Sequence, residues 1–253
     1  MPMLFLAITG GFLPAVVWLW FWLKEDERRP EPTSYIIQAF LIGGLAVIVA
    51  FFLERPLLLI FGELKSTYVS WSGFELVALP IIIAQSGLIL SWASIEEIVK
   101  FLGAKISVFE HREFDEPIDA MIYMITVALG FAAVENSLFL FDTLSTDGNH
   151  LYFLLTGHLR FLGATVVHVI SSAVVGGAVA LTFYRHPAVR AMAIFIGLVV
   201  AIVLHAFFNF FIINNDGQDV LAVLVALWVA AISIILLFEK VKRVSKPFNF
   251  IKQ

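Results

Sequence analysis

Apolar residues form long runs along this chain, and charged or turn-forming residues separate each run from the next. A transmembrane helix needs roughly 20 predominantly apolar residues. By that measure the predicted spans are Met3–Leu23, Ser34–Phe52, a stretch from near Pro80 to about Phe109, Ile118–Phe141, His158–Tyr184, Ala188–Ile213 and Val220–Phe238. The pattern therefore predicts an all-α integral membrane protein, a bundle of about seven transmembrane helices.

Two stretches need separate interpretation. The segment Glu54–Phe74 has an apolar core, Pro56–Phe61, that is too short to cross a bilayer, so we expect an interfacial or re-entrant segment. The first run has no basic residues before it and no clear small-residue cleavage site after it. We therefore expect a retained span and not a signal peptide.

Composition agrees with a membrane protein and excludes several functions. The 253 residues are 60% hydrophobic and 14% charged, whereas soluble domains are about 45–50% apolar and about 25% charged. The absence of cysteine excludes disulfides, thiolate zinc sites and a cysteine nucleophile. A net charge of −4 gives no basic surface for nucleic acid. We expect residues 1–253 to form a single polytopic membrane domain in contact with the lipid bilayer.

Basic residues are distributed unequally between the two sides. Seven spans would place 12 Lys and Arg residues on one side, counting five in the C-terminal tail, and only Arg55, Lys65 and Arg160 on the other. Cytoplasmic loops carry an excess of basic residues. The count predicts a plasma-membrane protein with a cytoplasmic C-terminus and an N-terminus outside.

Ionisable and polar residues interrupt four of the spans. They are Glu96, Glu97, Lys100, Glu135, Asn136, His168, Ser172, His205 and Asn209. A charged residue at the centre of a span costs about 2.5–3.5 kcal/mol, so four would cost roughly 10 kcal/mol or more. That sum is comparable to a whole folding free energy. We therefore expect these residues to meet in one hydrated intramembrane polar site.

The spacing of these residues supports a shared site. Glu96 and Lys100 are four residues apart and lie on one helix face, whereas Glu97 lies about 100° around the helix. His168 and Ser172 are four apart, as are His205 and Asn209.

Small residues in the same spans predict close helix packing. Ser172, Gly176 and Ala180 form a stripe of small residues, and Gly130 and Gly163 are expected to allow close approach in the same way.

Simpler interpretations exist for single residues. Asn209 or Ser172 alone would be a packing contact between helices, Arg160 would be interfacial, and Asp119 would be a helix N-terminal charge. The combination favours a functional site. It does not by itself separate a protease from a proton-coupled transporter or a non-proteolytic scaffold. Counting from the loops also places Glu135, His205 and Asn209 in the outer half of the membrane, and Glu96 near its middle.

Four sequence blocks resemble those of PrsW-type intramembrane proteases, which are distantly related to the CAAX prenyl proteases. Glu96-Glu97-Ile-Val-Lys100 is similar to an EExxK motif, and Asp115–Asn136 contains an FxxxE pattern ending at Glu135. Arg160–Gly176 resembles the block that carries His168, and His205 with Asn209 matches HxxxN. The resemblance covers about Trp92 to Phe211, within a protease-like core of about residues 80–213. Two positions depart from the usual family pattern: Ser172 stands where Thr is common, and Ala120 stands where Gly is frequent.

The resemblance implies an endopeptidase that cleaves membrane-anchored proteins, with anti-sigma factors as one substrate class. In this interpretation Glu96 is the general base on a water molecule. Glu97 and Glu135 adjust its protonation, and Lys100 keeps its partner carboxylate ionised. His205 and Asn209 donate hydrogen bonds to the developing oxyanion, and His168 orients the water or the base. Asn136 and Ser172 are supporting residues.

A metal site is the alternative arrangement of the same residues. Glu96, Glu135, His168 and His205 are suitable zinc ligands, but no short motif of two His at i, i+4 is present. Each of these His is followed four residues later by Ser or Asn, which are hydrogen-bonding partners. The sequence therefore favours a metal-independent glutamate mechanism, with zinc as the alternative cofactor.

Overall fold

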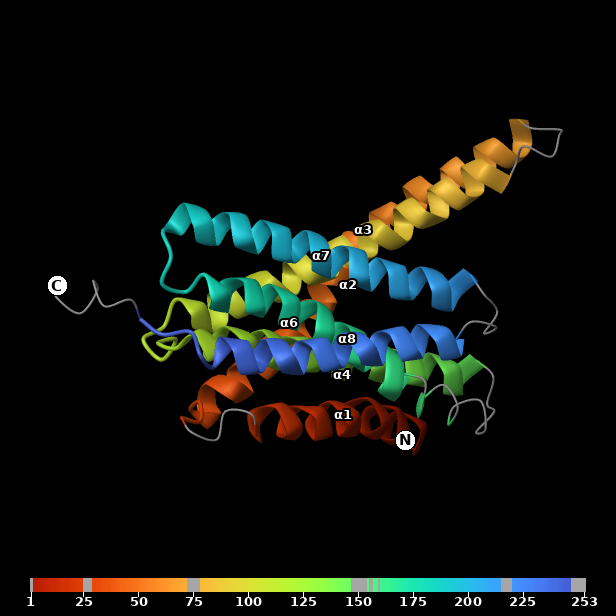
Figure 1. Ribbon diagram of the computed structural model, residues 1–253. Helices are drawn as coiled ribbons and strands as arrows, with labels where there is room; N and C mark the ends of the chain where they lie inside the picture. Colours follow the sequence, from red (N-terminus) through yellow and green to blue (C-terminus); the bar gives the residue numbers. More distant parts are fainter. Residues whose placement is uncertain are drawn as a thin grey trace.

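The computed structural model describes residues 2–24, 29–71, 78–146, 154, 157–158, 160–214 and 220–246, without the side chains of 62–83 or 213–220. Within these residues the chain forms helices only (Figure 1). The α-helices are α1 (Pro2–Leu23), α2 (Thr33–Trp71), α3 (Ala78–Ala104), α4 (Pro117–Thr146), α6 (Thr165–Leu181), α7 (Pro187–Asn214) and α8 (Val220–Val241). Two five-residue π-helical turns, η3 (Lys105–Phe109) and η4 (Arg160–Ala164), follow α3 and precede α6.

Six of these helices are long and apolar enough to cross a membrane, which confirms an all-α, multi-pass membrane protein. The six are α1, α2, α4, α7, α8 and the continuous segment formed by η4 and α6. The remaining α-helix of the described residues, α3, carries Glu96, Glu97 and Lys100. Its range, continued by η3, agrees with the predicted third span.

The prediction of an interfacial or re-entrant segment at Glu54–Phe74 is wrong for its first part, up to Phe61. Helix α2 runs without a break from Thr33 to Trp71, through Pro56. Its apolar part extends to Phe61, so Pro56–Phe61 continues the second span and does not begin a new one. Proline is tolerated inside membrane helices because neighbouring groups satisfy the backbone that it frees. The outer parts of α2 and α3 extend beyond the bundle as a helical hairpin (Figure 1). The last three residues of Glu54–Phe74 lie outside the described residues.

Helix α4 is the centre of the bundle. It contacts α1, α2 and α6, and most of its side chains are buried, from Pro117 to Leu144. A helix that is apolar on all sides and surrounded by other helices is expected in the core of a membrane bundle.

Small residues set how closely the other helices approach α4. A Cβ atom at Gly130 would lie 1.9 Å from the carbonyl oxygen of Phe40 in α2, and one at Gly176 would lie 2.7 Å from the carbonyl oxygen of Ala120. Both distances are too short for a real side chain, which confirms the predicted close contacts at these two glycines. At Gly163 the nearest neighbour is the flexible Phe208 ring, 3.0 Å away.

The helices alternate in direction, so that α1 begins and α8 ends at opposite ends of the bundle (Figure 1). The end at which α8 stops also holds residues 105–116 and residues 182–186 (Figure 1). These loops carry Lys105, Arg112 and Arg185, three of the 12 basic residues that the sequence assigns to one side. The orientation of this end toward the cytoplasm stays a prediction.

Candidate functional site

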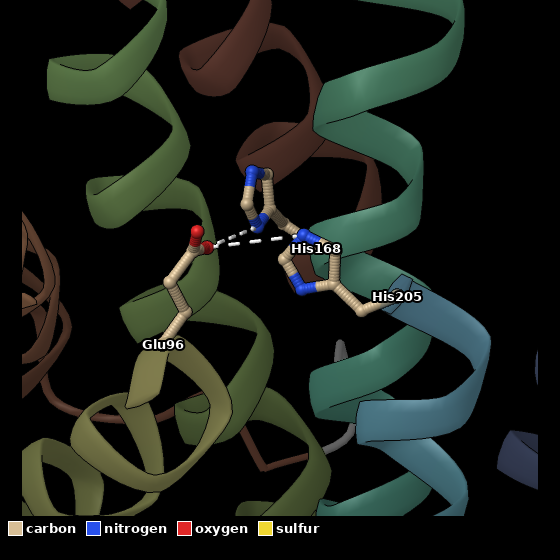
Figure 2. Close-up of side chains that lie close together, drawn as sticks. All are labelled: Glu96, His168 and His205. Atoms are coloured by element: carbon tan, nitrogen blue, oxygen red, sulfur yellow. Dashed lines mark ion pairs between the residues drawn. The ribbon is translucent and has the colours of Figure 1, made fainter. Parts of the chain in front are cut away.

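Four helices bring the predicted polar residues together in the middle of the bundle. Glu96, Glu97 and Lys100 come from α3, Glu135 and Asn136 from α4, His168 and Ser172 from α6, and His205 from α7. Figure 2 shows Glu96, His168 and His205 facing one another from three helices. Counting from the loops placed Glu96 at a different membrane depth from Glu135 and His205, yet the structure brings these residues together. Because the α2–α3 hairpin extends beyond the bundle, position along α3 does not measure depth in the membrane.

Lys100 is the buried cation of this cluster. Its ammonium nitrogen lies 2.7 Å from Glu97 Oε1, 2.9 Å from His168 Nδ1 and 3.6 Å from Glu96 Oε2. Lys100 and Glu97 both have side chains that are 0% exposed. The closer carboxylate partner of Lys100 is therefore Glu97, at i−3, although the i−4 residue Glu96 is also within ion-pair distance.

The contacts of the two histidines determine where their protons reside. An ammonium group can only donate hydrogen bonds and a carboxylate accepts them. Lys100 therefore donates to His168 Nδ1, and His168 Nε2 donates to Glu135 Oε2 at 2.7 Å. His205 Nδ1 lies 2.8 Å from Glu97 Oε1 and donates to it, so in the neutral imidazole His205 Nε2 carries no proton.

Three acceptor atoms consequently converge on one point. Glu96 Oε2 lies 3.8 Å from His168 Nδ1 and 3.8 Å from His205 Nε2 (Figure 2). Glu96 Oε2 is buried and accepts no hydrogen bond from any described residue. Lone pairs that face one another in a buried site repel. Lys100 relieves this repulsion at His168 Nδ1 and, from 3.6 Å, at Glu96 Oε2. It is therefore the pair of Glu96 Oε2 and His205 Nε2 that calls for a proton or a further cation.

The donor set fits a divalent metal such as zinc. Three atoms, one from each of Glu96, His168 and His205, lie within 4.8 Å of one another. Ligands at about 2.0–2.1 Å in tetrahedral geometry are about 3.3 Å apart, so the three atoms would have to approach one another by roughly 0.5–1.5 Å. Each histidine also has a carboxylate on its other ring nitrogen, which is the usual support of a metal-ligating histidine. Ligation by His168 Nδ1 would require Lys100 to release that atom and keep its bond to Glu97.

Glu135 lies behind His168 and not among the three converging atoms. Its Oε2 accepts from His168, and its Oε1 accepts from Arg160 Nη2 at 2.8 Å. Asn136, the next residue, accepts from Arg160 Nε at 2.5 Å and donates to Thr165 Oγ1 at 3.0 Å. The four-ligand set considered from the sequence thus becomes three converging residues and one that orients a histidine.

The remaining predicted residues are less closely connected. Ser172 Oγ lies 3.4 Å from Glu97 Oε2, at the long limit for a hydrogen bond. Asn209 lies one helical turn beyond His205 on α7. Within the described residues no hydrogen bond is recorded for the Asn209 side chain, which is partly exposed.

Sequence reasoning missed two charged residues beside the cluster. Arg160 was expected at an interface, yet its contacts connect it to Glu135. Glu54, in the supposed re-entrant segment, has a buried Oε1 with no hydrogen-bond partner among the described residues. Glu54 interacts electrostatically with Glu96 and Glu135. Its charge within an apolar stretch was the available signal, but the short run after Pro56 hid the continuity of α2.

Exposure differs between the two sides of the cluster. The side chains of Glu135, Arg160 and Glu96 are 33%, 15% and 12% exposed, whereas those of Lys100 and Glu97 are 0% exposed. The cluster is therefore closed on the Lys100 side and accessible on the side formed by Glu135 and Arg160.

Comparison with known proteins connects this geometry to a family. The chain is similar to proteins named Protease PrsW from Geobacillus kaustophilus, with 34% identity over 137 residues; Bacillus subtilis, with 25% over 227; and Clostridioides difficile, with 28% over 197. These alignments cover 54%, 89% and 75% of this chain and 53%, 92% and 72% of the respective relatives, so only about half of the first relative is matched. No solved structure gives a significant match. The model of the PrsW family of intramembrane metalloproteases matches residues 31–237, and because that match spans most of the chain, this protein belongs to the PrsW family.

Proposed function

We propose that this chain is an intramembrane protease that hydrolyses peptide bonds of membrane-anchored proteins at the cluster of Glu96, His168 and His205. The observation that carries the proposal is the convergence of these three residues inside a membrane bundle. Glu96 Oε2 lies 3.8 Å from both His168 Nδ1 and His205 Nε2, and one ligand atom from each residue lies within 4.8 Å of the others. The family match agrees with this chemistry.

Glu96 is the proposed acceptor of the proton from the reacting water. Its Oε2 receives no hydrogen bond from the described residues. The carboxylate can therefore take the proton through Oε2 when no metal is bound, and through its other oxygen when Oε2 is a metal ligand. General-base assistance of this kind typically contributes about 10²–10⁴-fold to a rate. The neighbouring Glu97 is unsuited to this task, because Lys100 and His205 both donate to its Oε1.

The same three residues are the proposed holders of a divalent metal ion. When bound there, the ion would polarise the water molecule and the peptide carbonyl. The carboxylates behind His168 and His205 support this choice over the metal-independent mechanism that the sequence favoured. Glu135 and Glu97 orient the two imidazoles, and Lys100 balances the charge of Glu97.

Asn209 is the proposed donor to the oxyanion that develops in the reaction. His205 was expected to share this role, but its Nδ1 proton is directed at Glu97 and its Nε2 faces Glu96 without a proton. The side-chain amide of Asn209, one turn away, is available. Removing one such donor in a known protease costs about 2.7–4 kcal/mol of transition-state stabilisation.

The proposed substrate is a single-span membrane protein that enters laterally from the lipid. The accessible side of the cluster, at Glu135 and Arg160, is where a peptide would reach Glu96. An anti-sigma factor is the substrate class that the family resemblance implies. A proton-coupled transporter would use similar buried carboxylates, and the two functions differ in whether a membrane-anchored protein accumulates when Glu96 is lost.

The decisive experiment compares Glu96→Gln with Glu110→Gln, a matched change at an exposed residue of the loop after η3. We expect Glu96→Gln to abolish cleavage in purified protein and to accumulate uncleaved membrane proteins in cells, as a deletion does. Glu110→Gln should behave like the wild type. Full activity of Glu96→Gln, or altered solute uptake without accumulation, would overturn the proposal.

Metal dependence is tested on the same purified protein. We expect about one equivalent of zinc or a similar metal by elemental analysis, loss of activity in strong chelator, and recovery when the metal is returned. His205→Ala should lose the metal, whereas His186→Ala, at an exposed turn, should keep it. Undiminished activity of a metal-free sample would restore the metal-independent mechanism.

A further inference from the structure

Arg160 connects the accessible side of the cluster to one of its histidines. It lies in η4, the π-helical turn that precedes α6, and its side chain reaches across to α4. The guanidinium donates to Glu135 Oε1 at 2.8 Å and to Asn136 Oδ1 at 2.5 Å. Its centre lies 4.3 Å from the centroid of the Phe139 ring. Three contacts from consecutive turns of α4 thus hold one side chain in place.

These contacts determine what the second oxygen of Glu135 can do. With Oε1 bound to Arg160, Oε2 is directed at His168 Nε2, 2.7 Å away. The ring then presents an unprotonated Nδ1, to which Lys100 donates, and Nδ1 is the atom that lies 3.8 Å from Glu96 Oε2. Through Glu135, the position of Arg160 therefore influences how the His168 ring is oriented in the central cluster.

The local helix geometry supports this role. A π-helical turn places an extra residue in the helix and changes the direction of its side chains, and such turns are frequent at functional sites. Asn136, which accepts from Arg160, also donates to Thr165, the first residue of α6. Two adjacent residues of α4 are thereby fixed to the segment that leads to His168.

We propose that Arg160 is a positioning residue that, through Glu135, holds His168 with Nδ1 facing Glu96. Arg160 touches neither the three converging atoms nor the reacting water. Its effect on metal binding and on turnover rests on the proposed function, whereas its effect on the His168 ring does not. An ordinary partly exposed ion pair would contribute about 0–1 kcal/mol to stability and would leave His168 unchanged.

The experiment compares Arg160→Gln and Arg160→Lys with Arg55→Gln, an exposed arginine 5.9 Å from the centroid of Phe51. The ¹⁵N shifts of the His168 ring nitrogens report its tautomer and the hydrogen bonding of each nitrogen in metal-free protein. Cobalt titration of the same protein gives metal affinity, and the melting temperature reports folding. We expect Arg160→Gln to loosen the contact between Glu135 and His168 and so to shift the ¹⁵N signal of His168 Nε2, while Lys100 keeps Nδ1 unprotonated. Cobalt binding should weaken by about 10–100-fold. The variant should also lower kcat with little change in KM.

Arg160→Lys should recover part of each effect, because lysine keeps the charge but loses the two-pronged contact to Glu135 and Asn136. Arg55→Gln should match the wild type. An unchanged His168 Nε2 signal together with an unchanged cobalt affinity in Arg160→Gln would overturn the proposal. If Arg160→Gln does not fold, the same readings on Arg160→Lys decide. If Arg160→Gln changes the His168 Nε2 signal but the wild-type protein cleaves no membrane protein, the role of Arg160 is upheld and the proposed function is rejected.

Discussion

Glu97 and Lys100 form an ion pair that is fully buried in the bundle. Each charge alone would cost several kcal/mol in such surroundings, and each is acceptable because the other lies 2.7 Å away. His205 and His168 add hydrogen bonds to the same pair. The pair therefore supports both histidines of the proposed site and the stability of the fold.

Loss of Lys100 should leave an uncompensated buried carboxylate. We expect Lys100→Met to lower the free energy of unfolding by roughly 3–5 kcal/mol, the range for breaking a buried pair. The measurement is denaturant or thermal unfolding in detergent. The control is Lys242→Met, which removes an exposed ion pair to Glu239 and should change stability by about 1 kcal/mol or less. Equal effects of the two changes would contradict this account of the buried pair.

Helices α2 and α4 cross at two glycines, Gly43 and Gly130. A Cβ atom at Gly43 would lie 2.0 Å from the carbonyl oxygen of Val127, and one at Gly130 would lie 1.9 Å from that of Phe40. The obstacle in each case is backbone, which cannot rotate away as a side chain can. Because Glu135 follows Gly130 by five residues on α4, this crossing also places Glu135 beside the site.

A methyl group at Gly130 should force α2 and α4 apart. We expect Gly130→Ala to lower the free energy of unfolding by about 1–3 kcal/mol, the usual cost of overpacking, and to reduce cleavage because Glu135 moves. Gly157→Ala is the control, since its Cβ would meet only Leu140 Cδ2 at 3.8 Å, an ordinary contact. Melting temperature and activity measured together would test this, and a fully stable Gly130→Ala would show that the crossing is not tightly constrained.

The whole molecule is a bundle in which α1 begins and α8 ends at opposite ends (Figure 1). The loops at the end where α8 stops contain most of the basic residues, so the positive-inside rule predicts that this end faces the cytoplasm. The accessible side of the cluster, at Glu135 and Arg160, lies toward the opposite end, because α4 continues from Glu135 to Thr146 in that direction.

Single cysteines introduced into this cysteine-free chain test the orientation directly. Ser145 is exposed near the end of α4, and Ser245 is exposed just after α8. We expect a membrane-impermeant maleimide to label Ser145→Cys in intact cells and Ser245→Cys only after the membrane is opened. The reverse pattern would invert the topology. Labelling of both cysteines in intact cells would contradict an odd number of membrane crossings between Ser145 and Ser245.

The sequence by itself determined the helices and the family. Long apolar runs predicted the membrane bundle, since the requirement to satisfy every backbone group in lipid is local and leaves helices as the solution for such runs. Charged residues within spans marked Glu96, Glu97, Glu135, His168 and His205 as candidates, because their desolvation cost is also a property of each position. Pattern reasoning failed at Pro56, where a proline inside a long helix was interpreted as a boundary.

Only the tertiary structure decided which polar groups face one another. The hydrogen-bonded residues Glu97 and His205 are 108 residues apart in sequence, and the ion-paired residues Glu135 and Arg160 are 25 apart. Whether they meet depends on how each helix is rotated and tilted. Glycine contacts, such as that of Gly130 with α2, set this orientation, and no local sequence pattern encodes it. For this reason the sequence placed Arg160 at an interface and left Glu135 among four equivalent ligands. The packed bundle put Arg160 on Glu135 and Glu135 behind His168.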